Sequence, residues 1–327
     1  MRVFSCRVCG SSLFFENTIC VSCQTDLAFS REERAIVPVD DNGRYVDADG
    51  STWYRCTNLA LSGCTWLTEV PGGYCFSCGL TRTRPSDEDL GGLREFKIAE
   101  EAKRRLVVEL DTLGFPIVPR SQDEENGLAF DLLSSVAEDV TTGHESGVIT
   151  LDLAESDDAH REKVRVDLDE PYRTMLGHFR HEIGHYIEWQ HVRGALIQQA
   201  RDLFGNEEDN YADAIERHYA KGPPAGWEDH YISRYATMHP FEDFAETFAH
   251  YLHICDTIET ASAHNLAAVA EPQESASFRD LVIEVWIPLS IALNQINRSM
   301  GKGALYPFVI PAPVLDKLQF VAQLPRR

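Results

Sequence analysis

The chain has 327 residues, which allows two or three domains, and 43% of them are hydrophobic, as in a globular protein. Its formal net charge is -22; residues 1–85 hold 8 Lys/Arg and 9 Asp/Glu, so -21 falls on residues 86–327. That charge argues against nucleic-acid binding. Without a membrane-length apolar run or a signal-peptide core near the start, we expect no membrane association.

The first cysteine group consists of two Cys-x2-Cys pairs separated by ten residues. Its members are Cys6, Cys9, Cys20 and Cys23. Two such pairs supply four thiolates for one tetrahedral zinc, and ten residues suffice for a β-hairpin between them. A redox dithiol would not explain the paired repeat. The spacing therefore predicts a structural zinc ribbon over residues 1–36.

A second cysteine group is less regular, because seven residues separate its first two members. Its members are Cys56, Cys64, Cys75 and Cys78. We interpret it as a degenerate repeat of the first site, a zinc ribbon-like module over residues 37–85; the alternative is a set of buried thiols packed among aromatic residues. Metal-bound thiols imply a reducing compartment, and we expect the cytoplasm. Because the ribbons carry no basic stripe, we expect them to dock a protein partner or present substrate.

A polar segment, Thr81–Gly92, reads as the linker to a larger domain over residues 86–327. An apolar stripe predicts a helix over Leu93–Leu113, and short strands are expected after it. The candidate strands are Leu128–Leu133, Val148–Leu153 and Val164–Leu168. A helix followed by a small sheet resembles the order of a zincin amino-terminal subdomain, and this resemblance implies that the edge strand lies beside a cleft and pairs with extended peptide.

The motif His181-Glu182-Ile183-Gly184-His185 reads HExxH. Two histidines four residues apart share one helix face and can bind one zinc ion, and the glutamate beside the first can take a proton from a metal-activated water. Pro171 in a first turn and an apolar stripe from Met175 to Ile187 support a helix. The alternative is an amphipathic helix with two surface histidines.

The remaining third of the chain reads as mostly helical. Helices are expected over Leu196–Phe204, over Asn206–Tyr219, from Pro240 through His250, over Phe278–Met300 with a kink at Pro288, and near Val314–Leu324.

A catalytic zinc has three protein ligands and one open position, so a third ligand is needed. His191 stands where the metzincin pattern HExxHxxGxxH has its third histidine, but Glu188 replaces the glycine that lets the chain leave the helix. The rival is Glu242, just after Pro240 in the later helix. The missing glycine counts against His191, and the alternative for Glu242 is a helix-terminal acid stabilised by the helix dipole.

The segment from Tyr235 to Glu246 resembles the corresponding part of the gluzincin peptidases anthrax lethal factor and Mlc titration factor A. This resemblance implies that Glu242 is a zinc ligand, that Glu246 orients the site, and that the Tyr235 hydroxyl contributes to the transition state. The whole chain resembles a bacterial family of zinc-binding metallopeptidases with amino-terminal zinc ribbons. The matching stretches are Gly177–Tyr186, His218–Pro224 and His239–Thr247.

We therefore expect an α+β chain in which two small zinc-ribbon modules precede a zincin-like, gluzincin metallopeptidase domain with a mostly helical carboxyl-terminal half. Its expected cofactors are one catalytic and two structural zinc ions, with Glu182 as general base and Tyr235 as oxyanion donor. Its expected substrate is a peptide or protein. The alternative function is an adaptor whose zincin-like body binds a peptide without cutting it, although such a module does not need Glu182.

Overall fold

The structure of the chain, a computed structural model, describes residues 3–135, 140–156, 174–268, 271–272, 275 and 277–324. The chain forms two compact units. One comprises Arg2–Thr112 and Pro116–Asp157, and the other comprises Leu113–Phe115 and Asp158–Arg327, together with Met1. None of the described helices is long and apolar enough to cross a membrane.

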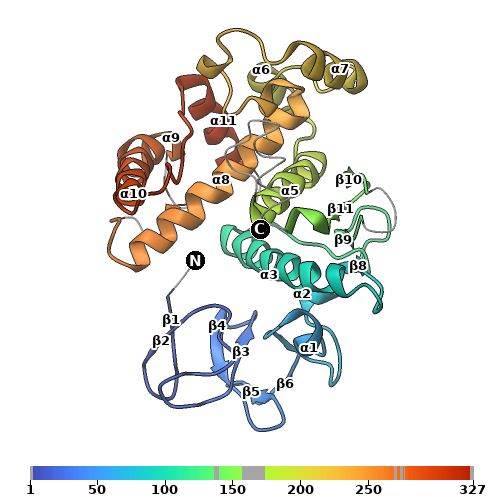
Figure 1. The fold of residues 1–327 in the computed structure, drawn as a ribbon, viewed down its shortest axis with the longest axis vertical. Coiled ribbons are helices and arrows are strands. Elements are labelled where there is room, and N and C mark those ends of the chain that lie inside the picture. Colours follow the sequence, from blue (N-terminus) through green and yellow to red (C-terminus); the bar gives the residue numbers. More distant parts are fainter. Residues whose placement is uncertain are drawn as a thin grey trace. The chain divides into compact units, whose positions relative to one another are not determined.

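The first unit begins with short strands around the cysteine pairs (Figure 1, blue). β1 (Phe4–Ser5) and β2 (Ser12–Leu13) pair antiparallel on either side of the first Cys-x2-Cys, so the hairpin encloses a pair instead of joining two pairs as predicted. The reason is that the cysteine loop itself reverses the chain, with Gly10 at φ 76°. The further elements are β3 (Leu27–Ser30), β4 (Ala35–Pro38), β5 (Arg44–Val46), β6 (Thr52–Arg55), α1 (Leu59–Ser62), β7 (Leu67–Thr68) and α2 (Phe76–Gly79).

Aromatic side chains from both cysteine modules form one buried core. The rings of Phe15 and Phe29 lie 4.9 Å apart, and the rings of Phe29 and Trp66 lie 5.0 Å apart. Phe4 adds an edge-on contact to Phe29 at 6.1 Å. Because modules of this size bury little surface alone, sharing a core gives each a larger apolar interior than its own residues could provide.

A four-stranded sheet and a long helix complete the first unit. The sheet order is β10 (Gly143–Glu145), β11 (Val148–Asp152), β9 (Ala129–Leu133), β8 (Thr81–Thr83), in which β11 and β8 run parallel to β9 and β10 runs antiparallel to β11. The predicted helix is confirmed as α3 (Leu90–Leu113), and the first two predicted strands are confirmed as β9 and β11. Thr81–Thr83 was wrongly assigned to the linker, because these residues pair with β9. The strand predicted at Val164–Leu168 and the turn at Pro171 lie outside the described residues.

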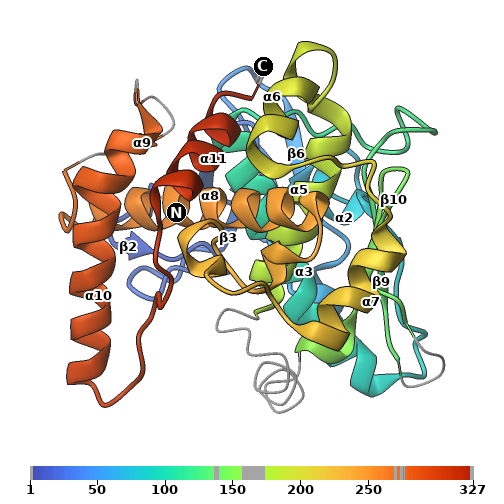
Figure 2. The same cartoon turned by 90° about the horizontal axis from the view of Figure 1, so that it is seen from above.

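The described part of the second unit is mainly helical, as predicted (Figures 1 and 2). Its helices are α5 (Met175–His191), α6 (Ala195–Phe204), α7 (Tyr211–Lys221), α8 (Pro240–Ala263), α9 (Phe278–Leu281), α10 (Ile287–Ser299) and α11 (Ala312–Ala322). Short 3-10 turns lie at Trp227–Asp229 and Tyr235–Thr237. A further 3-10 turn, Leu153–Ser156, belongs to the first unit. The kink predicted at Pro288 is instead a π-helical turn, Val282–Trp286, because Pro288 lies in the first turn of α10.

Helix α8 is the centre of the second unit, and both α5 and α11 pack against it (Figure 2). Thr174 caps the start of α5 by accepting a hydrogen bond from the Gly177 amide at 2.9 Å. His239 caps α8 through Nδ1, which accepts from the Phe241 amide at 3.1 Å. These two caps set where α5 and α8 begin. They therefore help to determine which side chains of α5 face α8 and which side chains of α8 face α5.

Candidate metal centres

Helices α5 and α8 bring three possible metal ligands together. His181 Nε2 lies 3.2 Å from His185 Nε2 and 3.0 Å from Glu242 Oε2, and His185 Nε2 lies 3.6 Å from Glu242 Oε1. Tetrahedral ligands about 2.0–2.2 Å from a zinc ion lie roughly 3.3 Å from one another, so this spacing fits a single zinc. The three residues form one of three groups in the described chain that could hold a metal ion.

The other face of His181 is fixed by a carboxylate. Its Nδ1 lies 2.8 Å from Glu246 Oε1, one helical turn after Glu242 in α8. The second oxygen of Glu246 accepts a hydrogen bond from the Ser233 hydroxyl at 2.7 Å. This chain of contacts sets the ring orientation of His181 and leaves Nε2 to face the metal position.

Glu182 lies on α5 between the two histidines and is buried. Its Oε1 is 3.3 Å from His178 Nε2, and its Oε2 has no hydrogen-bond partner among the described residues. Burial works to raise the pKa of Glu182, but the His178 contact and the charges of His181 and His185 lower the pKa overall. The carboxylate is therefore ionised at neutral pH with one oxygen able to accept a proton.

Two tyrosines lie at the same cluster. The ring of Tyr235 is 5.8 Å from the ring of His181, and burial together with the Glu242 carboxylate raises the Tyr235 pKa well above its ordinary value. The Tyr235 hydroxyl is thus protonated at neutral pH and can donate a hydrogen bond. Tyr211, the first residue of α7, donates its hydroxyl hydrogen to Glu242 Oε1 at 2.7 Å. Tyr211 and Ser233 were missed from the sequence, because neither belongs to a spaced motif: Tyr211 reaches the site from the start of α7 and Ser233 from a loop.

The structure brings Glu242, and not His191, to the two histidines. Helix α5 continues past Glu188 to His191, so the chain does not leave the helix where a metzincin would. Glu188 is itself buried, and burial with the charge of Glu242 raises its pKa well above the ordinary value. A neutral Glu188 side chain is therefore expected in α5.

The first four-cysteine group also fits one metal ion. Cys6 Sγ lies 3.7 Å from Cys23 Sγ, and Cys9 Sγ lies 3.6 Å from Cys20 Sγ. Zinc–sulfur bonds of about 2.3 Å place tetrahedral sulfurs roughly 3.8 Å apart. The predicted members of this cluster are all brought together.

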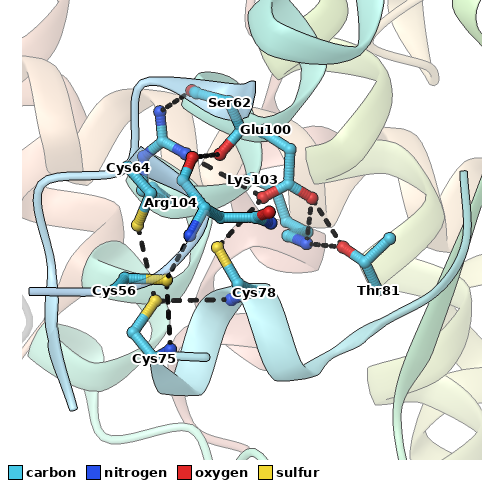
Figure 3. Close-up of polar contacts among 10 residues, drawn as sticks. Cys56, Ser62, Cys64, Cys75, Cys78, Thr81, Glu100, Lys103 and Arg104 are labelled. Carbon is cyan, nitrogen blue, oxygen red and sulfur yellow. Dashed lines mark hydrogen bonds and ion pairs between the residues drawn. The ribbon is translucent and has the colours of Figure 1, made fainter. Parts of the chain in front are cut away.

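The second four-cysteine group is buried throughout, despite its irregular spacing (Figure 3). Cys64 Sγ lies 3.5 Å from Cys75 Sγ, and the Cys75 amide donates to Cys56 Sγ at 3.3 Å. Cys78 Sγ is 3.6 Å from Glu100 Oε2 on α3. Backbone amides aimed at sulfur stabilise thiolates, as a structural metal site requires.

Buried charged side chains from α3 lie beside this second group (Figure 3). Lys103 Nζ lies 2.5 Å from Glu100 Oε1 and also donates to the Thr81 hydroxyl. Arg104 donates to the Ser62 carbonyl at 3.1 Å. One zinc with four thiolates carries a net charge of about two negative units. Lys103 and Arg104 together bring two positive charges to this buried region against the one carboxylate of Glu100, so they offset part of that charge.

The chain thus combines two four-cysteine centres with a helical unit that carries a His-His-Glu centre. Residues 92–324 match the family described as "Putative zinc-binding metallo-peptidase", and residues 3–89 match a zinc-ribbon domain. The chain belongs to this metallopeptidase family, which confirms the membership predicted from the sequence. Uncharacterized proteins of Mycobacterium tuberculosis and Mycobacterium bovis are 51% identical to it over 98% of this chain and 94% of their own length. No solved structure matches the chain.

Proposed function

We propose that the protein is a zinc-dependent peptidase of the gluzincin type. The observation that carries this proposal is the spacing of 3.0–3.6 Å among the donor atoms of His181, His185 and Glu242, with the ionised Glu182 beside them. A purely structural zinc site would be closed by a fourth protein ligand, whereas this group offers three, as catalytic zinc sites do.

Zinc at this centre would polarise a substrate carbonyl and make a water molecule nucleophilic. Glu182 would accept the proton of that water at Oε2 and pass it to the leaving amine. Tyr235 would donate a hydrogen bond to the oxyanion that develops on the carbonyl. Glu246 would hold His181 in the tautomer that presents Nε2.

The zinc ribbons would serve this peptidase by docking a protein partner or presenting substrate. We propose a peptide or protein substrate, no nucleic-acid ligand and no membrane association, in keeping with the net charge of -22. All nine cysteines are free thiols, and eight form the metal-ligand groups, which fits a reducing compartment; we propose the cytoplasm.

The test is a cleavage screen on a degenerate peptide library, with Glu182→Gln as the inactive comparison. Glu182→Gln should keep all its zinc and lose nearly all cleavage, because Glu182 is not a ligand. Tyr235→Phe should keep the metal and slow turnover about a hundred- to a thousand-fold. His191→Ala is the matched control and should cleave like the parent. Peptide binding without cleavage by the zinc-loaded parent would instead support the adaptor function.

A further inference from the structure

The hydrogen bond from Tyr211 to Glu242 joins helix α7 to the His-His-Glu centre. Glu242 is 2% exposed and its Oε1 accepts from the Tyr211 hydroxyl at 2.7 Å, while its Oε2 is the oxygen 3.0 Å from His181 Nε2. Each oxygen of Glu242 therefore lies near one histidine of the centre, Oε2 near His181 and Oε1 3.6 Å from His185 Nε2, but only Oε1 also accepts from the phenol.

The hydroxyl of Tyr211 is held at this place by the start of both helices. Asn210 caps α7 by accepting from the Asp213 amide at 3.2 Å. The ring of His239, the residue that caps α8, lies edge-on to the Tyr211 ring at 5.1 Å. Because His239 Nδ1 accepts from the Phe241 amide, its Nε2 carries the proton and donates to the Asp209 carbonyl at 3.0 Å. His239 thus ties the first residues of α7 to the first turn of α8.

We propose that Tyr211 is a positioning residue which keeps Glu242 a single-oxygen ligand of the metal. This inference rests on the proposed function. Oε1 lies 3.6 Å from His185 Nε2, close enough to reach the same metal, but it is engaged by Tyr211. The hydrogen bond would therefore leave Oε2 as the oxygen that binds a metal held by His181 and His185. A carboxylate with both oxygens available can bind a metal through both, and that would fill the position which a catalytic zinc keeps open for water or substrate. The hydrogen bond, which is partly buried, also fixes the carboxylate before the metal arrives.

The experiment compares Tyr211→Phe with Tyr219→Phe in the full chain. Tyr219 lies two turns further along α7 and is 63% exposed, so Tyr219→Phe removes a tyrosine hydroxyl from the same helix. Zinc affinity of the His-His-Glu centre is measured by competition with a chelator while both cysteine centres stay loaded. Tyr211→Phe should lower this affinity about ten- to a hundred-fold, as the loss of a partner of a metal ligand does, and Tyr219→Phe should not change it.

Cobalt substituted into the His-His-Glu centre alone gives a second readout. Four-coordinate cobalt absorbs visible light more strongly than five-coordinate cobalt, so Tyr211→Phe should weaken the bands as Glu242 binds through both oxygens. Circular dichroism and retained zinc in the cysteine centres show that the variant is folded.

Equal affinity and an equal cobalt spectrum for Tyr211→Phe and the parent would overturn the role of Tyr211. Glu242→Ala is measured in parallel. If Glu242→Ala loses the metal while Tyr211→Phe behaves like the parent, only the role of Tyr211 is wrong. If Glu242→Ala keeps the metal with parental affinity, the proposed ligand set has failed, and with it this inference.

Discussion

Gly184, inside the HExxH segment, packs directly against the backbone of Ala245. A Cβ atom built on Gly184 would lie 2.9 Å from the Ala245 Cα and 3.1 Å from its carbonyl oxygen. Helices α5 and α8 can therefore approach each other at this point only because residue 184 has no side chain. The same approach brings Glu242, one turn before Ala245, to the two histidines.

Gly184→Ala should therefore weaken the metal centre without touching a ligand. The added methyl group meets backbone atoms, which cannot rotate away, so the helices must separate by a few tenths of an ångström. We expect a loss of about 1–3 kcal/mol in the free energy of unfolding, as overpacking produces, and a measurable loss of zinc affinity at the His-His-Glu centre. Gly303→Ala is the control, since nothing lies within 4 Å of its added Cβ. Parental zinc affinity in Gly184→Ala would contradict this role for the helix contact.

The motifs that could be predicted from the sequence are those whose ligands lie close along the chain. His181 and His185 share a helix face, and each Cys-x2-Cys pair is closed by its own turn, so local geometry suffices. Glu242 is different: pattern and resemblance identified it as a candidate, but its approach to the histidines depends on the packing of α5 against α8 at Gly184.

Other parts of the structure could not be predicted, because they depend on contacts between distant segments. The Tyr211 hydroxyl reaches Glu242 only because His239 joins α7 to α8. Thr81–Thr83 has the polar composition of a linker, and its strand is too short to show a pattern in the sequence. Only its pairing with β9 identifies it as a strand. The π-helical turn before α10 contains no helix-breaking residue, so the sequence predicted the kink at the proline that follows it.

Lys103→Met should destabilise the first unit through the second cysteine centre. Lys103 and Glu100 are both fully buried and lie 2.5 Å apart. Removing the cation leaves Glu100, beside Cys78, with the Thr81 hydroxyl and the longer 3.9 Å contact to Arg104. Breaking a buried ion pair in this way costs about 3–5 kcal/mol. Adding Glu100→Gln to Lys103→Met should recover most of that loss.

Chemical denaturation followed by tryptophan fluorescence measures these changes in the free energy of unfolding. Lys97→Met, an exposed lysine on the same helix α3, is the control and should stay within about 0.5 kcal/mol of the parent. A loss in Lys103→Met no larger than in Lys97→Met would show that the buried pair does not stabilise the first unit.

Elemental analysis of the purified protein should find three zinc ions per chain, one for each group of ligands. The two cysteine centres should resist mild chelation, because four thiolates close each site, while the His-His-Glu centre should lose its zinc. Cys56→Ser should reduce the count to two, and Cys255→Ser, which changes a thiol in α8 outside both groups, should leave it at three. A parent that holds two zinc ions would mean that the irregular second group binds none.

His250→Asn should make the protein less sensitive to acid. His250 Nδ1 lies 2.8 Å from the Tyr306 hydroxyl, and burial, aided by the charge of Arg180 and opposed by that of Glu246, lowers the His250 pKa to about 4 from 6.5. Between pH 4 and pH 6.5, His250 is protonated in the unfolded chain but neutral in the folded protein. The stability that this difference contributes is therefore fully present above about pH 6.5 and is lost as the pH falls toward 4.

The size of this effect follows from the two pKa values. Each unit of difference corresponds to about 1.36 kcal/mol, so His250 should remove about 2 kcal/mol of stability between pH 7 and pH 5. Urea denaturation of zinc-loaded parent and His250→Asn at both pH values measures the two losses, and the parent should lose about 2 kcal/mol more. Asparagine keeps a polar group near the position of Nδ1 but does not titrate, and effects common to both proteins, including ligand protonation, cancel in the difference. Equal losses in the two proteins would mean that His250 takes up its proton in the folded state as readily as in the unfolded chain.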